Sequence, residues 1–394
     1  MDISYFLKLM AEKGASDMFL STGAPVNIKV DGKLHPLGSN GLPPGMVKKI
    51  AYSMMSEGQV PEFEREHELN LAISVKSAGR FRVNVFRQRG EVSMVIRAIQ
   101  SQVASIDKLR LPALMKDLIM EKRGLLLVVG AAGSGKSTSL AAMIDYRNRS
   151  ATGHILTIED PIEYLHNHHR SVVNQREIGF DTNSYHNALR SAMREAPDVI
   201  LIGEIRDTET MEAALQYAET GHLCLATLHS NNADQTMARI LNFFPEATHK
   251  QILQQLSLNL RGIISQRLVP LKEGNGRVPA VEVLLNTPRV ADLIRSGDIY
   301  QLKEAMEKSL DDGMQTFDEA LFNLYKSEEI TLEEALRNAD SRDGLAVKIR
   351  FAEGDSSLSD EELEADSAFG DEDNTAGIVD PYDIDSMEPD GNFR

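Results

Sequence analysis

Cysteine is nearly absent from this chain: Cys224 is the only one among 394 residues. A single cysteine excludes an internal disulfide framework and a four-cysteine zinc module, so we expect a reducing compartment, the cytoplasm. The first residues contain no basic segment followed by an apolar run, so no secretory signal is predicted. The longest apolar runs, such as residues 125–129, are far shorter than the roughly 18 residues that span a bilayer. Contact with a membrane is therefore expected only through partners.

A dense stripe of basic residues is also missing. The formal net charge is −17, but residues 353–394 hold 15 acidic residues and 1 basic residue, a net −14 that leaves −3 for the first 352 residues. The body of the chain is thus nearly neutral and lacks the surface typical of nucleic-acid binding, so no nucleic-acid partner is expected. Residues 353–394 contain few apolar side chains, which predicts a disordered acidic tail.

Two folded segments are predicted before this tail, and 42% hydrophobic residues are enough to fill their cores. Residues 1–110 combine an amphipathic helix with short alternating strands, which is typical of a small α+β domain. The predicted strands are residues 18–21, 26–30, 80–86 and 92–99, the last two joined by a turn at residues 88–90.

The second segment, residues 111–352, reads as a strand, a glycine loop and a helix, followed by more apolar strands that alternate with helices. This order predicts an α/β fold with a doubly wound, largely parallel sheet. The four clearest strands are short and apolar, as strands covered on both faces should be: residues 125–129, 155–158, 199–202 and 223–227. After Pro245 the pattern predicts mostly helix, through residues 251–264 and again through residues 316–339.

A phosphate-binding loop follows the first of these strands. Residues 130–137 match the pattern G-x-x-x-x-G-K-[ST] in full, between a predicted strand and a predicted helix. In such a loop the backbone N–H groups surround the β-phosphate, Lys136 reaches the β- and γ-phosphate oxygens and Ser137 ligates magnesium. The alternative, a chance glycine turn, disagrees with the strand and helix on either side. The predicted ATP-binding residues are Gly130, Ala131, Ala132, Gly133, Ser134, Gly135, Lys136, Ser137 and Thr138.

Three carboxylates follow the second strand: Glu159, Asp160 and Glu163. Ligands of parallel sheets bind at the carboxyl ends of the strands, where acids can hold a magnesium-bound water or orient the water that attacks a phosphate. Glu159 and Asp160 are therefore candidate magnesium ligands. A solvated acidic loop is the alternative.

The third strand ends in a single acid, Glu204, directly after Gly203. An apolar strand that ends in an acid is the Walker B arrangement, which predicts Glu204 beside the phosphate loop and near the Mg²⁺ of bound ATP. Gly203 would allow the backbone to approach the nucleotide or the metal. A buried strand with an exposed terminal glutamate is the alternative.

Histidines flank the fourth strand: His222 precedes it and His229 follows it. Both positions suit a sensor of the γ-phosphate, although each histidine is equally compatible with a hydrogen-bonded structural role. His166, His168 and His169 are clustered, but no cysteine or carboxylate pattern accompanies them, so a solvated loop is favoured over a metal site.

The first segment carries an arginine-rich hairpin. In residues 80–86 the alternation places apolar residues on one face and arginines on the other. Such arginines can act as fingers that stabilise phosphate charge across a subunit boundary, and an ordinary solvated strand face is equally consistent. The arginines of this hairpin are Arg80, Arg82, Arg87, Arg89 and Arg97.

Taken in order, the four motifs resemble the Walker A, Asp box, Walker B and His box of the secretion ATPases. They read GAAGSGKST, TIEDPIEYLH, VILIGEIRD and GHLCLATLHSNNA. Among these ATPases, the chain resembles the PilT/PilU-type retraction ATPases of the type IV pilus, from its first residues to about Ala352. This resemblance implies a PAS-like first domain, a RecA-like second domain and a hexameric ring. It also implies Glu163 as general base, Glu204 as Walker B acid, His222 and His229 near the γ-phosphate, and Arg82 and Arg97 as candidate trans arginines.

Two departures from the PilT pattern favour the accessory PilU-type branch. The chain reads RVADLIRS at residues 289–296, where PilT proteins carry an AIRNLIRE-like helix, and it continues past MQTFDEAL into the acidic tail. We therefore expect a motor for pilus retraction and twitching motility that works with a PilT-like ring and an inner-membrane platform protein, at the inner face of the cytoplasmic membrane. The alternative is an adaptor that binds a PilT ring and needs little ATPase activity of its own. A nucleic-acid translocase is disfavoured, because no basic channel signature is present.

Overall fold

The computed structural model describes residues 3–30, 32–76, 78–274, 276–310 and 313–353. The chain forms two compact units, Met1–Asp340 and Ser341–Arg394. In the second unit the described part is helix α14 (Arg342–Glu353). The predicted acidic tail lies outside the described residues from position 354 onward.

The first sheet is antiparallel and has the strand order β3-β2-β1-β6-β5-β4. On β5, Phe81, Val83 and Val85 are buried, which confirms the predicted alternation. The four predicted strands correspond to β1, β2, β5 and β6, whereas β3, β4, α2 and α3 had no counterpart in the prediction. The elements are α1 (Ile3–Glu12), β1 (Asp17–Leu20), β2 (Asn27–Val30), β3 (Lys33–Pro36), α2 (Met46–Met54), α3 (Gln59–Glu66), β4 (Glu68–Val75), β5 (Gly79–Gln88) and β6 (Glu91–Ile99).

The second sheet has the order β13-β12-β7-β11-β10-β8-β9, and its pairs are parallel except for the hairpin β12–β13. The largely parallel sheet predicted from the sequence is therefore confirmed, with β7, β8, β10 and β11 at the four expected places. Its strands are β7 (Gly124–Val129), β8 (Gly153–Glu159), β9 (Ser171–Glu177), β10 (Val199–Ile202), β11 (Leu223–Leu228), β12 (Leu260–Pro270) and β13 (Arg277–Leu285).

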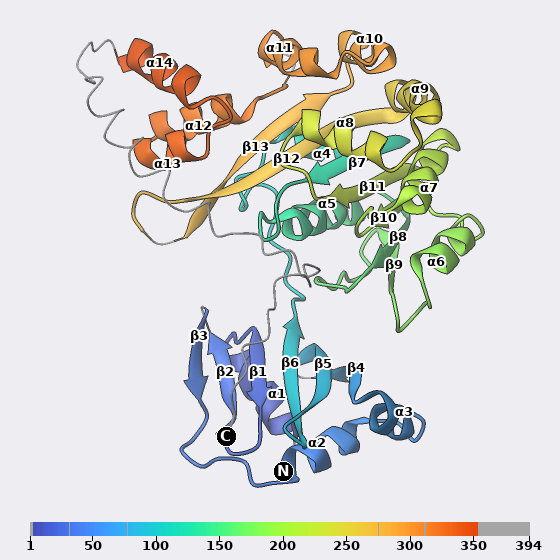
Figure 1. Cartoon of the computed structure of the whole chain (residues 1–394), viewed down its shortest axis with the longest axis vertical. Helices are drawn as coiled ribbons and strands as arrows, with labels where there is room; N and C mark the ends of the chain where they lie inside the picture. Colours follow the sequence, from blue (N-terminus) through green and yellow to red (C-terminus); the bar gives the residue numbers. More distant parts are fainter. Residues whose placement is uncertain (1–2, 31, 77, 275, 311–312, 354–394) are drawn as a thin grey trace, which may run out of the picture. The chain divides into compact units, whose positions relative to one another are not determined.

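Helices cover both faces of this sheet (Figure 1). Alternate residues of β7 divide between two apolar clusters: Leu126 and Val128 pack with one group of helices, and Leu125 and Leu127 with the other. Each fully buried leucine contributes about 2 kcal/mol of transfer free energy. One group is α4 (Leu114–Ile119) and α5 (Lys136–Ser150); the other is α6 (Tyr185–Ala192), α7 (Thr208–Glu219), α8 (Ala233–Asn242), α9 (His249–Asn259) and α10 (Pro288–Ser296).

The predicted helix at residues 251–264 is wrong in its last part. Helix α9 ends at Asn259, and Leu260 already begins β12. The error has a physical cause: Leu253, Leu256, Leu260 and Ile263 are buried at helical spacing, so the apolar pattern continues across the boundary. Strand pairing with β7 and β13 decides the structure of residues 260–264, and local periodicity does not report that pairing.

Short helices follow the hairpin. Thr287 caps α10, accepting a hydrogen bond from Val290 N, and Pro288 occupies its first turn. The helices predicted in residues 316–339 are found as α12 and α13. Among the described residues, no helix combines the length and the apolar character needed to cross a membrane. The remaining elements are η1 (Glu246–Thr248), η2 (Ile299–Gln301), α11 (Leu302–Glu307), α12 (Phe317–Lys326) and α13 (Leu332–Arg337).

Candidate nucleotide-binding site

A cavity of about 250 Å³ lies at the carboxyl ends of the parallel strands β7, β8, β10 and β11. The topology brings the ends of these strands to one edge, where ligands of α/β sheets bind. Predicted site residues from three motifs and one histidine line the cavity together: Ala132, Gly133, Lys136, Ser137, Glu159, Asp160, Glu163, Glu204 and His229.

The phosphate loop joins the end of β7 to the start of α5. Gly130, Gly133 and Gly135 have φ values of 146°, 77° and 92°, a region that residues with a side chain rarely adopt. A Cβ at Gly130 would lie 2.5 Å from the Gln266 backbone oxygen, so glycine is also required by the close approach of β12. The loop therefore presents its backbone N–H groups at a helix N-terminus, which is the arrangement that binds phosphate.

Lys136 is buried within this loop. Its Nζ donates hydrogen bonds to Gly130 O at 2.8 Å and Ala131 O at 2.9 Å. Burial lowers the pKa of Lys136, an effect opposed by the nearby charges of Glu204 and Glu163. An ammonium group held among phosphate-loop carbonyls is placed to move onto phosphate oxygens.

Glu159 is the last residue of β8 and forms one wall of the cavity. Its Oε1 accepts hydrogen bonds from Thr157 Oγ1 at 2.6 Å and Gln175 Nε2 at 3.3 Å. Burial raises the pKa of the Glu159 carboxyl to about 7. Glu163, by contrast, is exposed beyond the cis Asp160–Pro161 bond, and its backbone oxygen accepts from Gln100 N.

Glu204 lies between two nitrogen-bearing side chains. Its Oε2 accepts a hydrogen bond from Arg206 Nε at 2.6 Å, and its Oε1 lies 3.1 Å from His229 Nε2. Arg206 also reaches Asp160, with 3.5 Å between Nη1 and Oδ2. The hydrogen bond to Glu204 raises the pKa of Arg206. The Asp box, Walker B and His box are thus joined through charged side chains at the cavity wall.

Two further residues, not anticipated from the sequence, shape the site. The Tyr164 hydroxyl lies 2.9 Å from Thr138 Oγ1, which ties the Asp-box loop to α5. The Tyr185 hydroxyl packs against Gly203, where a Cβ would lie 3.1 Å from it. Tyr164 follows Glu163 directly and could have been identified from the motif. Tyr185 lies between motifs in the sequence and enters the site only through the fold.

His222 does not reach this cavity, which corrects its predicted contact with the γ-phosphate in the same chain. It precedes β11, whereas His229 follows that strand. The six residues of β11 separate the two histidines by about 20 Å along the strand. His222 Nδ1 lies 3.1 Å from Thr220 Oγ1 and 3.3 Å from Tyr217 O, at the opposite edge of the sheet.

The neighbouring histidines of the Asp-box loop also differ among themselves. His166 lines the cavity, and burial lowers its pKa to about 4, so it is not part of a merely solvated loop as predicted. His168 and His169 are exposed, and His168 Nδ1 accepts from Val173 N. Among the described residues, no group of three or more His, Cys, Asp or Glu side chains is arranged to hold a metal ion.

The two candidate trans arginines are cross-strand partners on β5 and β6. Arg97 is mostly exposed and donates to Asp17 through Nε at 2.8 Å. Arg82 Nη1 lies 3.8 Å from Oε1 of Glu177, a buried oxygen to which no described residue donates a hydrogen bond. Neither arginine lines the cavity of its own chain.

The donor set at the cavity fits magnesium. Mg²⁺ prefers oxygen ligands and is bound in nucleotide sites through one or two side chains together with waters and phosphates. Ser137 supplies a hydroxyl, and Glu204 and Asp160 supply carboxylates at the same wall. Glu159 fits less well, because Thr157 Oγ1 and Gln175 Nε2 already donate hydrogen bonds to its Oε1.

Comparison with known proteins identifies the family. Residues 2–277 match the family described as type II/IV secretion system protein. The type IV pilus ATPase PilU of Pseudomonas aeruginosa strain PAO1 is 51% identical over 351 residues, 89% of this chain and 92% of PilU. The retraction ATPase PilT of the same strain is 42% identical, over 86% of this chain and 98% of PilT. A crystal structure of the pilus retraction motor PilT with bound ADP matches with a TM-score of 0.82 at 43% identity, covering 87% of this chain and 98% of that one. The chain therefore belongs to the type II/IV secretion system protein family.

Proposed function

We propose that this chain hydrolyses ATP to drive retraction of type IV pili. Its similarity to PilU and PilT over most of each sequence supports this activity. The observation that carries the proposal is the single cavity in which Lys136, Glu163 and Glu204 meet. A phosphate loop alone would indicate only nucleotide binding, whereas two acids at the same wall add the groups needed for hydrolysis.

The residues of the cavity divide the chemistry among them. Backbone N–H groups of the phosphate loop and Lys136 bind the phosphates, and Glu163 acts as the general base that takes the proton of the attacking water. Ser137 and Glu204 would hold Mg²⁺, with Asp160 beside them. The metal supplies charge neutralisation at the phosphate oxygens. His229 contacts Glu204 and is the histidine placed to respond to the γ-phosphate.

The working form is a homo-hexameric ring in which Arg82 and Arg97 act across a subunit boundary. Residues 1–110 form a PAS-like domain and residues 111–352 a RecA-like domain. The ring lies in the cytoplasm, at the inner face of the inner membrane, against a pilus platform protein. The higher identity to PilU than to PilT favours an accessory motor that cooperates with a PilT-like ring.

Motility of cells that carry variants of this chain tests the proposal. Deletion should abolish or weaken twitching while surface pili remain, and a Lys136→Ala chain should fail to restore it. Purified Lys136→Ala protein should lose magnesium-dependent ATPase activity by about 100-fold or more, because an ammonium contact to the phosphates is removed. ATPase activity that survives this substitution would contradict the proposed site.

A Glu204→Ala chain separates a motor from an adaptor. A motor requires this acid, so twitching should be lost although the protein still assembles. Full twitching with Glu204→Ala, together with loss of twitching on deletion, would instead identify an adaptor that joins a PilT ring.

A further inference from the structure

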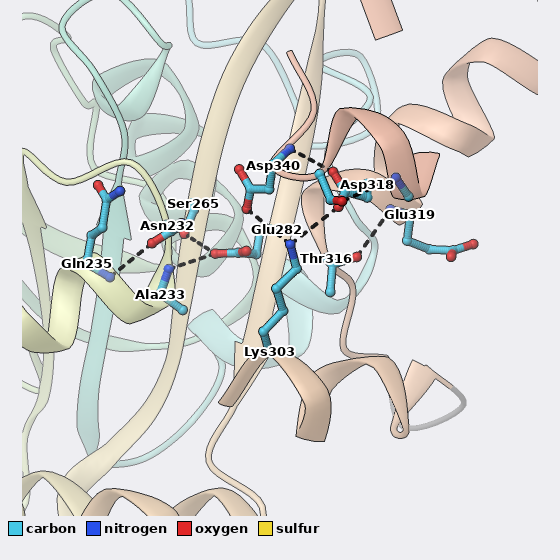
Figure 2. A network of polar contacts seen from close by, with 12 residues as sticks. Asn232, Ala233, Gln235, Ser265, Glu282, Lys303, Thr316, Asp318, Glu319 and Asp340 are labelled. Carbon is cyan, nitrogen blue, oxygen red and sulfur yellow. Dashed lines mark hydrogen bonds and ion pairs between the residues drawn. The ribbon is translucent and has the colours of Figure 1, made fainter. Parts of the chain in front are cut away.

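Glu282 is a carboxylate buried behind the ATP site, and the four sequence motifs do not include it. It lies on β13, and only 3% of the residue is exposed. Its Oε1 accepts hydrogen bonds from Ala233 N at 2.7 Å and Ser265 Oγ at 2.8 Å (Figure 2). Burying a carboxylate is costly unless donors compensate it, so both hydrogen bonds hold their elements in place.

The first donor belongs to the segment that carries His229. Ala233 is the first residue of α8, four residues after His229. Buried hydroxyls fix the turn between them: Ser230 Oγ lies 2.7 Å from Thr236 Oγ1, which donates to Asn232 O at 2.7 Å. The start of α8 and the His229 turn therefore move as one piece, and Glu282 holds that piece.

The second donor belongs to the strand behind the phosphate loop. Ser265 is followed on β12 by Gln266, whose Oε1 accepts from Ser139 Oγ of α5 at 2.7 Å. The backbone oxygen of Gln266 lies against Gly130. Glu282 thus connects two structures of the ATP site, the phosphate loop through β12 and the His229 turn through α8.

A cluster of ion pairs lies beside Glu282 (Figure 2). Asp340 Oδ1 lies 2.6 Å from Arg267 Nη2, and Asp340 Oδ2 lies 3.9 Å from Lys303 Nζ. Lys303 also pairs with Asp318 of α12 at 3.3 Å. The cluster joins β12, α11, α12 and the residues after α13, so the charge next to Glu282 depends on how these elements are arranged.

From this geometry we propose that Glu282 is a positioning residue for ATP hydrolysis, which fixes the His229 turn relative to the phosphate loop. The inference rests on the proposed function. Its effect is on the hydrolytic step: loss of Glu282 loosens the turn that carries His229, whereas the loop that binds the phosphates keeps its own hydrogen bonds.

The pH dependence of turnover reports on the same group. Burial is the main cause that raises the pKa of Glu282 to about 7, and Asp340 and Asp234 act in the same direction. Because the buried site raises this pKa above its ordinary value, ionisation of Glu282 as pH rises from 6 to 8 should weaken the fixed turn relative to a loosened turn in which the carboxylate is solvated. The charged groups that surround Glu282 are Asp234 of α8, Arg267 of β12, Lys303 of α11, Asp318 of α12 and Asp340.

Steady-state kinetics of the purified full chain test the assignment. Glu282→Ala should lower kcat about tenfold and leave KM for MgATP and the affinity for ADP within about twofold. Glu282→Gln keeps an acceptor oxygen but cannot ionise, so it should lower kcat only two- to fivefold at pH 6 and lessen the fall of kcat that ionisation of Glu282 causes between pH 6 and 8.

Asn286→Ala is the matched control. Asn286 also ties buried backbone, donating to Ser257 O and Leu260 O at 2.9 Å each, but it follows the far end of β13. It should lower stability without the selective loss of kcat. Equal kcat losses in Asn286→Ala and Glu282→Ala, or an unchanged pH profile in Glu282→Gln, would overturn the positioning role.

Hydrogen exchange separates this inference from the proposed function. Backbone amides of residues 229–236 should exchange faster in Glu282→Ala than in the parent chain, whereas residues 130–137 should change little. This comparison needs no hydrolysis, so an inactive parent chain would contradict the proposed function and leave the exchange test in force. Unchanged exchange at residues 229–236 would overturn the inference.

Discussion

Two regions of the second sheet each hold a glutamate whose pKa burial raises to about 7, yet they are built differently. Glu159, at the cavity, accepts from Thr157, two residues earlier on the same strand, and from Gln175 on the adjacent strand. Glu282, on the β12–β13 hairpin, accepts from Ala233 and Ser265, 49 and 17 residues away. The cavity is assembled from strand ends and their own loops, whereas the hairpin connects distant elements. We therefore expect residues of the cavity to affect ATP hydrolysis directly, and Glu282 of the hairpin to affect it by positioning other residues.

The largest expected difference between the two regions is in turnover. Glu163→Gln or Glu204→Gln at the cavity should lower kcat by about 100-fold, equivalent to about 3 kcal/mol, because the proposed general base or the proposed magnesium ligand is lost. The expected tenfold loss for Glu282→Ala is clearly smaller. Steady-state ATPase assays measure both.

Glu195→Gln is the control for charge. Glu195 pairs with Arg176 at 2.9 Å and does not line the cavity, so its kcat should stay within about twofold of the parent value. A loss at Glu282 as large as that at Glu204 would show that the hairpin takes part in the chemistry itself.

The pH dependence of stability tests whether both glutamates are as buried as the comparison requires. In the folded chain both pKa values are raised from 4.5 to about 7, so the folded state binds protons more tightly than the unfolded state between these values. Stability from each group is therefore present below pH 4.5 and is lost as pH rises toward 7, by about 3 kcal/mol per group. Glu159→Gln and Glu282→Gln should each flatten this decline.

Urea unfolding midpoints at pH 5, 6, 7 and 8 measure the slopes for the parent and both variants. The pH slope of each variant is compared with the slope of the parent chain, because other carboxyl groups titrate in the same range and contribute to both slopes. If only one variant flattened the decline, the two environments would differ in burial, and the comparison would have to be revised.

A smaller effect is expected from the ion cluster beside the hairpin. Asp340→Asn removes the charge that faces Arg267 and Lys303, so it should lower the free energy of unfolding by about 1 to 2 kcal/mol. Asp292→Asn breaks an exposed pair with Arg295 and should cost less than about 0.5 kcal/mol. Equal costs for the two variants would mean that the cluster adds no more than a surface pair.

The smallest expected effect is at the edge of the cavity. Tyr185→Phe keeps the ring and removes the hydroxyl beside Gly203, so kcat should fall no more than about threefold. Tyr217→Phe is the matched control, because its hydroxyl donates to Leu189 O outside the cavity and affects stability rather than turnover. A tenfold loss of kcat in Tyr185→Phe would place its hydroxyl within the hydrolytic machinery.

The same contrast explains how far the sequence predicts the structure. Gly130, Lys136, Glu159 and Glu204 were predictable because each ends or closely follows a short apolar strand or begins the next helix, so local pattern fixes their place. His222 precedes β11 and lies away from the cavity, because ligands of parallel sheets bind at the carboxyl ends of the strands and His222 is at the amino end.

The hairpin could not be predicted in this way. Leu260 and Ile263 continue the helical spacing of α9 and form a strand only because β7 and β13 pair with them. The contacts of Glu282 depend on that pairing, so no local sequence pattern predicts them. Sequence motifs therefore locate the candidate reacting groups. The fold is needed to find Glu282, the residue proposed to position them.

A structure of the chain with Mg²⁺ and an ATP analogue would test the central claim most directly. We expect the phosphates within the loop of residues 130–137, with Lys136 Nζ moved from the Gly130 and Ala131 oxygens onto the phosphates and Glu204 beside the metal. A nucleotide bound elsewhere, with Lys136 still held by the loop carbonyls, would contradict the assignment of this cavity as the ATP site.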